Sequence, residues 1–135
     1  MARITRTDLF DFANFKDGTV AAVGHTRAVA HSFAFPTGAP KITGTLHGHE
    51  VFTLEQHPHI SVLTVSHAGF QTVTTTAAIN DFLKAAGIRM GLSQAGGKLT
   101  LTASGERVKQ TDMGVLPIAL DRDTLRPVMD LEATS

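Results

Sequence analysis

The feature that most constrains this chain is one strong helix signal near its middle. Four apolar residues follow the i, i+3, i+4, i+7 spacing that makes a single buried stripe on a helix: Ile79, Phe82, Leu83 and Ala86. Thr75 or Thr76 can supply the N-cap oxygen. Gly87 stands where a left-handed residue ends a helix, and Ile88 can fold back on the stripe in a Schellman ending. The pattern predicts an amphipathic helix over about 76–86.

Runs rich in β-branched and aromatic residues flank this helix on both sides. Before it, Thr45–Gln56 and His59–Val65 have this composition, and Pro58 separates them. After it, Gly96-Gly97 joins two further runs, as expected for a tight hairpin, because both residues accept a positive φ. Strands on both sides of a single helix predict an α+β fold with a mainly antiparallel sheet and one central helix.

The two ends of the chain carry weaker signals. Leu9, Phe12 and Ala13 share one face of a predicted short N-terminal helix over about 8–14. Residues 112–135 are apolar, yet prolines interrupt them, so they predict an irregular C-terminal arm. We therefore expect a single α+β domain over 1–111. The arm, 112–135, would pack on that domain or on a partner subunit, and the second case would make a homo-oligomer.

Composition excludes several classes of function. Twelve Lys plus Arg balance twelve Asp plus Glu, so the chain lacks the positive charge that nucleic-acid binding normally uses, and nucleic acid is an unlikely partner. There is no Cys, which excludes disulfides, thiolate zinc sites and a Cys nucleophile. No secretory signal and no stretch of eighteen apolar residues is present. These features predict a soluble, cytoplasmic protein that contacts no membrane.

Histidine is the residue type that most suggests chemistry. His47-Gly48-His49 and His57-Pro58-His59 are two His-x-His pairs. Alternate residues of a strand point to the same face, so each pair could share a zinc, iron or nickel ion if it lay in a strand. Other histidines and glutamates nearby could complete such a site: Glu50, Glu55, His25, His31 and His67. The alternative is that both pairs are polar turn residues.

No motif predicts a bound cofactor or a catalytic residue. The glycine-rich segment from Gly91 to Lys98 departs from a phosphate-binding loop, because Leu99 stands where that loop has a hydroxyl residue. The same segment leads into a predicted strand, whereas a phosphate loop opens a helix. We expect a hairpin there, with no cofactor.

Two segments together resemble a known group of sequences. They are Phe12-Ala-Asn-Phe15 with Gly18, and Val65–Thr76 running into Ile79-Asn80-x-Phe82-Leu83. This combination resembles small proteins and domains carried by bacteriophages, especially actinobacteriophages. The resemblance implies a phage-encoded protein that acts in the cytoplasm of the bacterial host. It implies no particular activity.

These observations favour a small non-enzymatic binding protein, one that a phage uses to engage a host protein. The first alternative is a histidine-rich metal-binding domain or a metal-dependent enzyme, with His47, His49, His57 and His59 as ligands. The second alternative is a nucleic-acid-binding protein built on a sheet and one helix.

Overall fold

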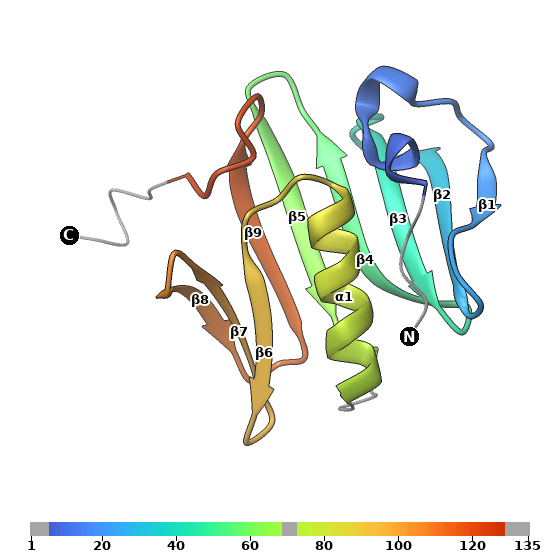
Figure 1. Ribbon diagram of the computed structural model, residues 1–135. Helices are drawn as coiled ribbons and strands as arrows, with labels where there is room; N and C mark the ends of the chain where they lie inside the picture. The colour runs from blue at the N-terminus through green and yellow to red at the C-terminus, as the bar shows by residue number, and fades with distance from the viewer. Residues whose placement is uncertain (1–5, 69–72, 129–135) are drawn as a thin grey trace.

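The computed structural model describes residues 6–68 and 73–128 as two antiparallel sheets and one α-helix (Figure 1). The larger sheet has the strand order β1-β2-β3-β4-β5-β9, formed by Val20–Ala22, Arg27–Phe33, Pro40–Leu46, His49–Gln56, Ile60–Ser66 and Val115–Asp121. The smaller sheet has the order β6-β7-β8, formed by Gly91–Ala95, Lys98–Ala103 and Glu106–Thr111. The helices are α1 (Val73–Ala85) and two 3-10 helices, η1 (Thr7–Phe10) and η2 (Phe12–Asn14). Every strand pairing is antiparallel, which confirms the predicted α+β class.

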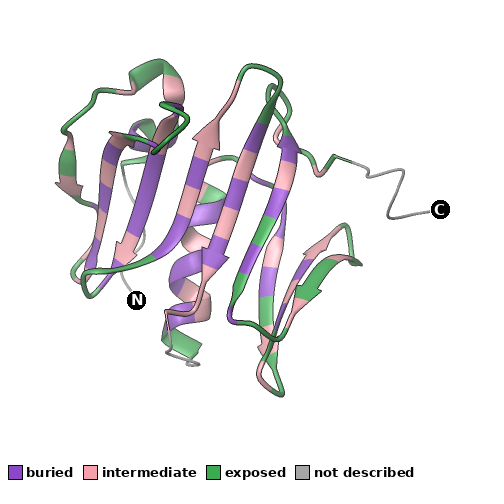
Figure 2. Ribbon diagram, turned by 180° about the vertical axis from the view of Figure 1, so that it is seen from behind, coloured by how far each residue is buried: buried purple, intermediate pink, exposed green. Residues whose placement is uncertain are grey.

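The helix α1 lies across one face of the larger sheet, and the smaller sheet stands beside it next to β9 (Figure 1). It contacts β3 and β4 of the larger sheet and β6 of the smaller sheet. Seen from behind, the central strands alternate between buried and less buried residues (Figure 2), as strands with one covered face do. Across the described ranges, no helix has the length and apolarity that a bilayer crossing requires.

Three phenylalanine rings form the centre of the core, and we call Phe10, Phe52 and Phe82 the inner aromatic cluster. Phe10 comes from η1, Phe52 from β4 and Phe82 from α1, and their centroids are 5.7–6.1 Å apart. The Phe82 ring also lies directly over Gly44 of β3, where an added Cβ would come within 3.0 Å of three ring carbons. Glycine at this position therefore allows α1 to approach the sheet closely.

The C-terminal end of α1 is the predicted Schellman ending. Gly87 has a φ of 77°, and its N–H donates to the carbonyl of Lys84 at 3.1 Å. The N–H of Ile88 donates to the carbonyl of Leu83 at 2.9 Å. These two hydrogen bonds satisfy carbonyls that the last helical turn leaves open, which confirms the prediction.

The beginning of α1 differs from the prediction. The helix begins at Val73, so Thr75 and Thr76 lie inside its first turns instead of capping it. Thr75 is buried, and the hydroxyl of Thr76 donates to the side-chain carbonyl of Gln94 at 3.2 Å. The Thr76 hydroxyl, which the sequence suggested as the N-cap of the helix, therefore joins α1 to β6.

The N-terminal segment forms two 3-10 helices, so the prediction of one short helix over 8–14 was wrong in detail. Asp11 between them is extended, with φ −102° and ψ 124°. Its carboxylate accepts a hydrogen bond from the N–H of Ala13 at 2.9 Å and caps η2. This break allows Phe10 to enter the core while Phe12 stays half-buried at the surface.

The predicted irregular arm was wrong for Val115–Asp121, because these residues form strand β9 and pair with β5 along their whole length. Leu116, Ile118 and Leu120 are buried and alternate with more exposed neighbours, as in a strand with one covered face. Pro117 is compatible with this strand because β9 lies at the edge of the sheet. The described part of 112–135 therefore packs on its own domain, and residues 129–135 lie outside the described ranges.

Candidate functional site

Four phenylalanines lie at the surface, near the end of the molecule where β2 leads into β3. Phe15 is the centre of this group: its ring centroid is 6.3 Å from that of Phe12 and 5.2 Å from that of Phe33. Phe33 is 52% exposed, and Phe35, two residues further along, is 96% exposed. We call Phe12, Phe15, Phe33 and Phe35 the outer aromatic surface.

A buried histidine holds the N-terminal part of this surface against β2. The Nδ1 atom of His31 accepts a hydrogen bond from the N–H of Lys16 at 3.1 Å, and its Nε2 atom lies 2.7 Å from the carbonyl oxygen of Leu9. These partners require a neutral ring that carries its proton on Nε2. The ring also stacks on Phe15, with centroids 5.3 Å apart and an interplanar angle of 13°. His31 thereby fixes the position of Phe15, the central ring of the outer aromatic surface.

The turn over residues 34–39 presents Phe35 to solvent. Ala34 and Ala39 at its ends are buried, and the N–H of Ala34 donates to the carbonyl of Ala39 at 2.7 Å. A second hydrogen bond, also 2.7 Å, joins the N–H of Gly38 to the carbonyl of Ala34. The turn is thus held by its own main chain, while the Phe35 side chain projects away from it.

The chemistry of this surface favours recognition of an apolar group. Its centre consists of aromatic carbon, and both ring nitrogens of the adjacent His31 are already engaged by main-chain groups. Charged side chains at its margin, Asp11, Lys16 and Asp17, are exposed to water. An apolar centre with a polar margin is the usual composition of a protein-binding surface.

The predicted metal ligands lie elsewhere, on two turns. His47 and Gly48 form the two-residue turn between β3 and β4, with φ values of 51° and 80°, so the predicted continuous strand Thr45–Gln56 was wrong at this point. Positive φ values at both turn residues match a type I′ hairpin turn, which favours Gly in its second position. The predicted strand is therefore interrupted at His47-Gly48. His49 begins β4 on the other side of this turn.

The second histidine pair lies between β4 and β5. The Nε2 atom of His57 lies 3.1 Å from the Glu55 carboxylate, and His59 precedes the first residue of β5. The two pairs are at opposite ends of β4, about 23 Å apart at the usual rise of ~3.3 Å per residue. Within the described ranges, no three His, Asp or Glu side chains come together as metal ligands. Metal binding by His47, His49, His57 and His59 stays a prediction for which the fold provides no shared site.

Sequence reasoning did not identify the outer aromatic surface, although part of its signal is present. Phe33 and Phe35 have the i, i+2 spacing of residues on one strand face, but nothing local shows that this end of β2 is uncovered. The contact of Phe15 with β2 depends on His31, a pairing across 16 positions that no local pattern reveals. No family model, curated protein or solved structure matches this chain.

Proposed function

We propose that this protein is a binding protein that recognises a partner protein through the outer aromatic surface. The observation that carries the proposal is the Phe35 side chain, almost fully exposed on a turn that two main-chain hydrogen bonds hold in place. Exposed apolar area costs about 25 cal/mol per Å², so a partner that covers the exposed rings of Phe33 and Phe35 gains free energy. Phenylalanine is one of the residue types enriched in the buried centres of protein–protein interfaces.

The surface also defines the kind of partner that fits it. A ring on a preformed turn loses little conformational entropy on binding, which favours insertion into an existing recess. The partner should therefore present an apolar recess wide enough for the Phe35 ring, with a neighbouring flat apolar area for Phe33. The resemblance to phage proteins suggests that this partner is a protein of the bacterial host and that binding takes place in its cytoplasm.

The test compares the wild-type chain with a Phe33→Ser, Phe35→Ser double variant. Each is used to capture proteins from an actinobacterial lysate, and any captured protein is then purified and its Kd measured by calorimetry. Met113→Ser is the matched control, because Met113 is 81% exposed in the β8–β9 connection, at the opposite end of the molecule from the β2–β3 connection (Figure 1).

We expect the double variant to bind the purified partner at least tenfold more weakly, while the control binds within twofold of wild type. A partner that binds both variants equally well would contradict the proposal. Binding that appears only with DNA, and weakens steeply with salt, would favour the nucleic-acid alternative instead.

A further inference from the structure

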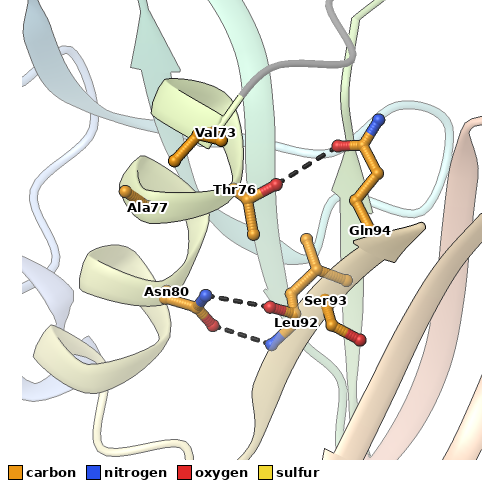
Figure 3. A pocket seen from close by; sticks show the side chains of 7 residues that line it. All are labelled: Val73, Thr76, Ala77, Asn80, Leu92, Ser93 and Gln94. Carbon is orange, nitrogen blue, oxygen red and sulfur yellow. Dashed lines mark hydrogen bonds between the residues drawn. The ribbon is translucent and has the colours of Figure 1, made fainter.

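A groove of about 460 Å³ lies between α1 and β6, and none of its lining residues belongs to the outer aromatic surface. Its lining residues are Val73, Thr76, Ala77, Asn80, Leu92, Ser93 and Gln94 (Figure 3). None of these side chains is ionisable, and several carry hydroxyl or amide groups. The groove therefore suits an uncharged ligand that forms hydrogen bonds.

One wall of the groove is the open edge of a strand. β6 pairs with β7 on one side only, through the register Leu92↔Leu101 and Gln94↔Leu99. In an antiparallel pair, main-chain groups alternate between facing the partner strand and facing away. The N–H and C=O of Leu92 face away from β7 and toward α1, because Asn80 binds both of them.

Asn80 takes the place of a strand partner for Leu92. Its Oδ1 accepts a hydrogen bond from the N–H of Leu92 at 2.7 Å, and its Nδ2 donates to the carbonyl of Leu92 at 2.9 Å (Figure 3). These are the two hydrogen bonds that a neighbouring strand residue would form. The edge of β6 is thus closed at Leu92 by a side chain of α1.

The same edge is open at Gln94, two residues along the strand and therefore in the same orientation. Among the described residues, the main-chain N–H and C=O of Gln94 have no hydrogen-bond partner at this edge. Its side-chain carbonyl accepts a hydrogen bond from Thr76, but its Nε2 atom is buried without any partner. Buried donors without partners are rare, because each costs free energy. Gln94 consequently offers its main-chain N–H and C=O to a ligand in the groove.

We infer that the groove binds an extended peptide segment of another protein, which pairs as a short strand with β6 at Gln94. A peptide main chain offers a donor and an acceptor at the spacing of a strand edge, and the addition of a peptide strand to an exposed sheet edge is a recurring mode of recognition. Ala77 and the exposed Val73 provide a small apolar wall for one side chain of the peptide. Because the wall is small and uncharged, that side chain should be small and apolar.

The experiment uses a phage-displayed library of random linear twelve-residue peptides, selected on the wild-type protein. The affinity of each enriched peptide is then measured for wild type, for Ala77→Arg and for Thr74→Arg. Ala77→Arg places a long side chain in the groove, whereas Thr74 is exposed on the same helix and does not line the groove, so it is the matched control. Amide hydrogen exchange at Gln94 in the wild-type protein gives a second measurement that needs no variant.

We expect Ala77→Arg to weaken peptide binding at least tenfold, Thr74→Arg to change it less than twofold, and exchange at Gln94 to slow at least tenfold on binding. The Phe33→Ser, Phe35→Ser variant should bind the same peptides as well as wild type, so this inference and the proposed function can fail separately. The inference is overturned if the library yields no binding peptide, if enriched peptides bind Ala77→Arg as well as wild type, or if Gln94 exchange is unchanged.

Discussion

The two aromatic clusters of this protein, namely the inner aromatic cluster and the outer aromatic surface, have similar ring spacings and different roles. Ring centroids are 5.7–6.1 Å apart in the inner cluster and 5.2–6.3 Å apart between Phe15 and its two phenylalanine neighbours. The rings of Phe10, Phe52 and Phe82 are covered by both the sheet and α1, whereas Phe33 is half exposed. Contact between rings therefore does not decide which phenylalanines stabilise the fold; coverage by other elements does.

The two clusters meet in a short segment at the N-terminus. Phe10 belongs to the inner cluster and Phe12 to the outer one, and only the extended residue Asp11 separates them. His31 is close to the same segment. Its Nε2 atom is hydrogen-bonded to the carbonyl oxygen of Leu9, and its ring stacks on Phe15. Substitutions in this region can consequently test how far the clusters depend on each other.

Removing a ring from the inner cluster should have the largest effect. Phe82→Ala creates a cavity between α1 and β3, and we expect it to lower the free energy of unfolding by about 3–5 kcal/mol. Phe35→Ala, the outer counterpart, should change that free energy by less than about 0.5 kcal/mol, because its side chain lies in water. Urea unfolding of both variants measures the difference, and equal losses would contradict the division into two clusters.

Adding one methyl group beneath the inner cluster should have the next largest effect. Gly44→Ala would place a Cβ 3.0 Å from the Phe82 ring, and the strand backbone leaves little room to relax. We expect a loss of about 1–3 kcal/mol, the usual range for overpacking a core. Gly91→Ala is the matched control, because the nearest atom to a Cβ there would be 3.8 Å away. A Gly44→Ala protein as stable as the control would show that α1 does not lie this close to β3.

Replacing the histidine between the clusters should have a moderate effect on stability and a visible effect on the outer surface. His31→Leu preserves bulk but leaves the N–H of Lys16 and the carbonyl of Leu9 without their partner. We expect a loss of about 1–2 kcal/mol, since buried polar groups without partners are destabilising. NMR should show faster exchange of the Lys16 amide and altered shifts at Phe15, with the Phe82 signals unchanged. Movement of the inner cluster instead would show that the two clusters are coupled.

The smallest effect concerns an exposed ion pair beside η1. Asp8 accepts hydrogen bonds from Arg6 at 3.1 Å, and these bonds lower the pKa of the Asp8 carboxyl from its ordinary value. A pKa that is lower in the folded than in the unfolded state adds stability at neutral pH. That stability is lost as the pH falls through the folded-state pKa, below an ordinary aspartate value of about 3.9.

Asp8→Asn should therefore lose a little stability at neutral pH and show a shallower loss between about pH 5 and pH 2. Asp112→Asn, an exposed position outside this segment, is the control, and unfolding free energies across the pH range provide the measurement. The effect is small because water and salt screen an exposed pair. An identical pH profile for wild type and Asp8→Asn would show that the pair contributes nothing to the folded state.

Local pattern predicted those elements whose signals lie within a few residues. The stripe from Ile79 to Ala86, the Gly87 ending and the Gly96-Gly97 hairpin were all visible in the sequence and are present in the structure. The sequence missed β9, because Pro117 reads as a breaker until the strand is known to lie at a sheet edge. For the two histidine pairs the sequence left a strand and a turn open, and the structure places His47 in the β3–β4 turn, His49 at the start of β4, and His57 and His59 between β4 and β5.

The sequence by itself determined the fold class, the central helix and the positions of several turns, because capping, periodicity and backbone freedom act over one or two turns of chain. Only the tertiary structure decided which phenylalanines are covered, how His31 anchors the N-terminal segment, and how Asn80 closes one part of the β6 edge and leaves Gln94 open. Those outcomes depend on contacts between residues far apart in the chain. A local pattern specifies which face of an element is apolar, but the packing of the whole chain selects what covers that face.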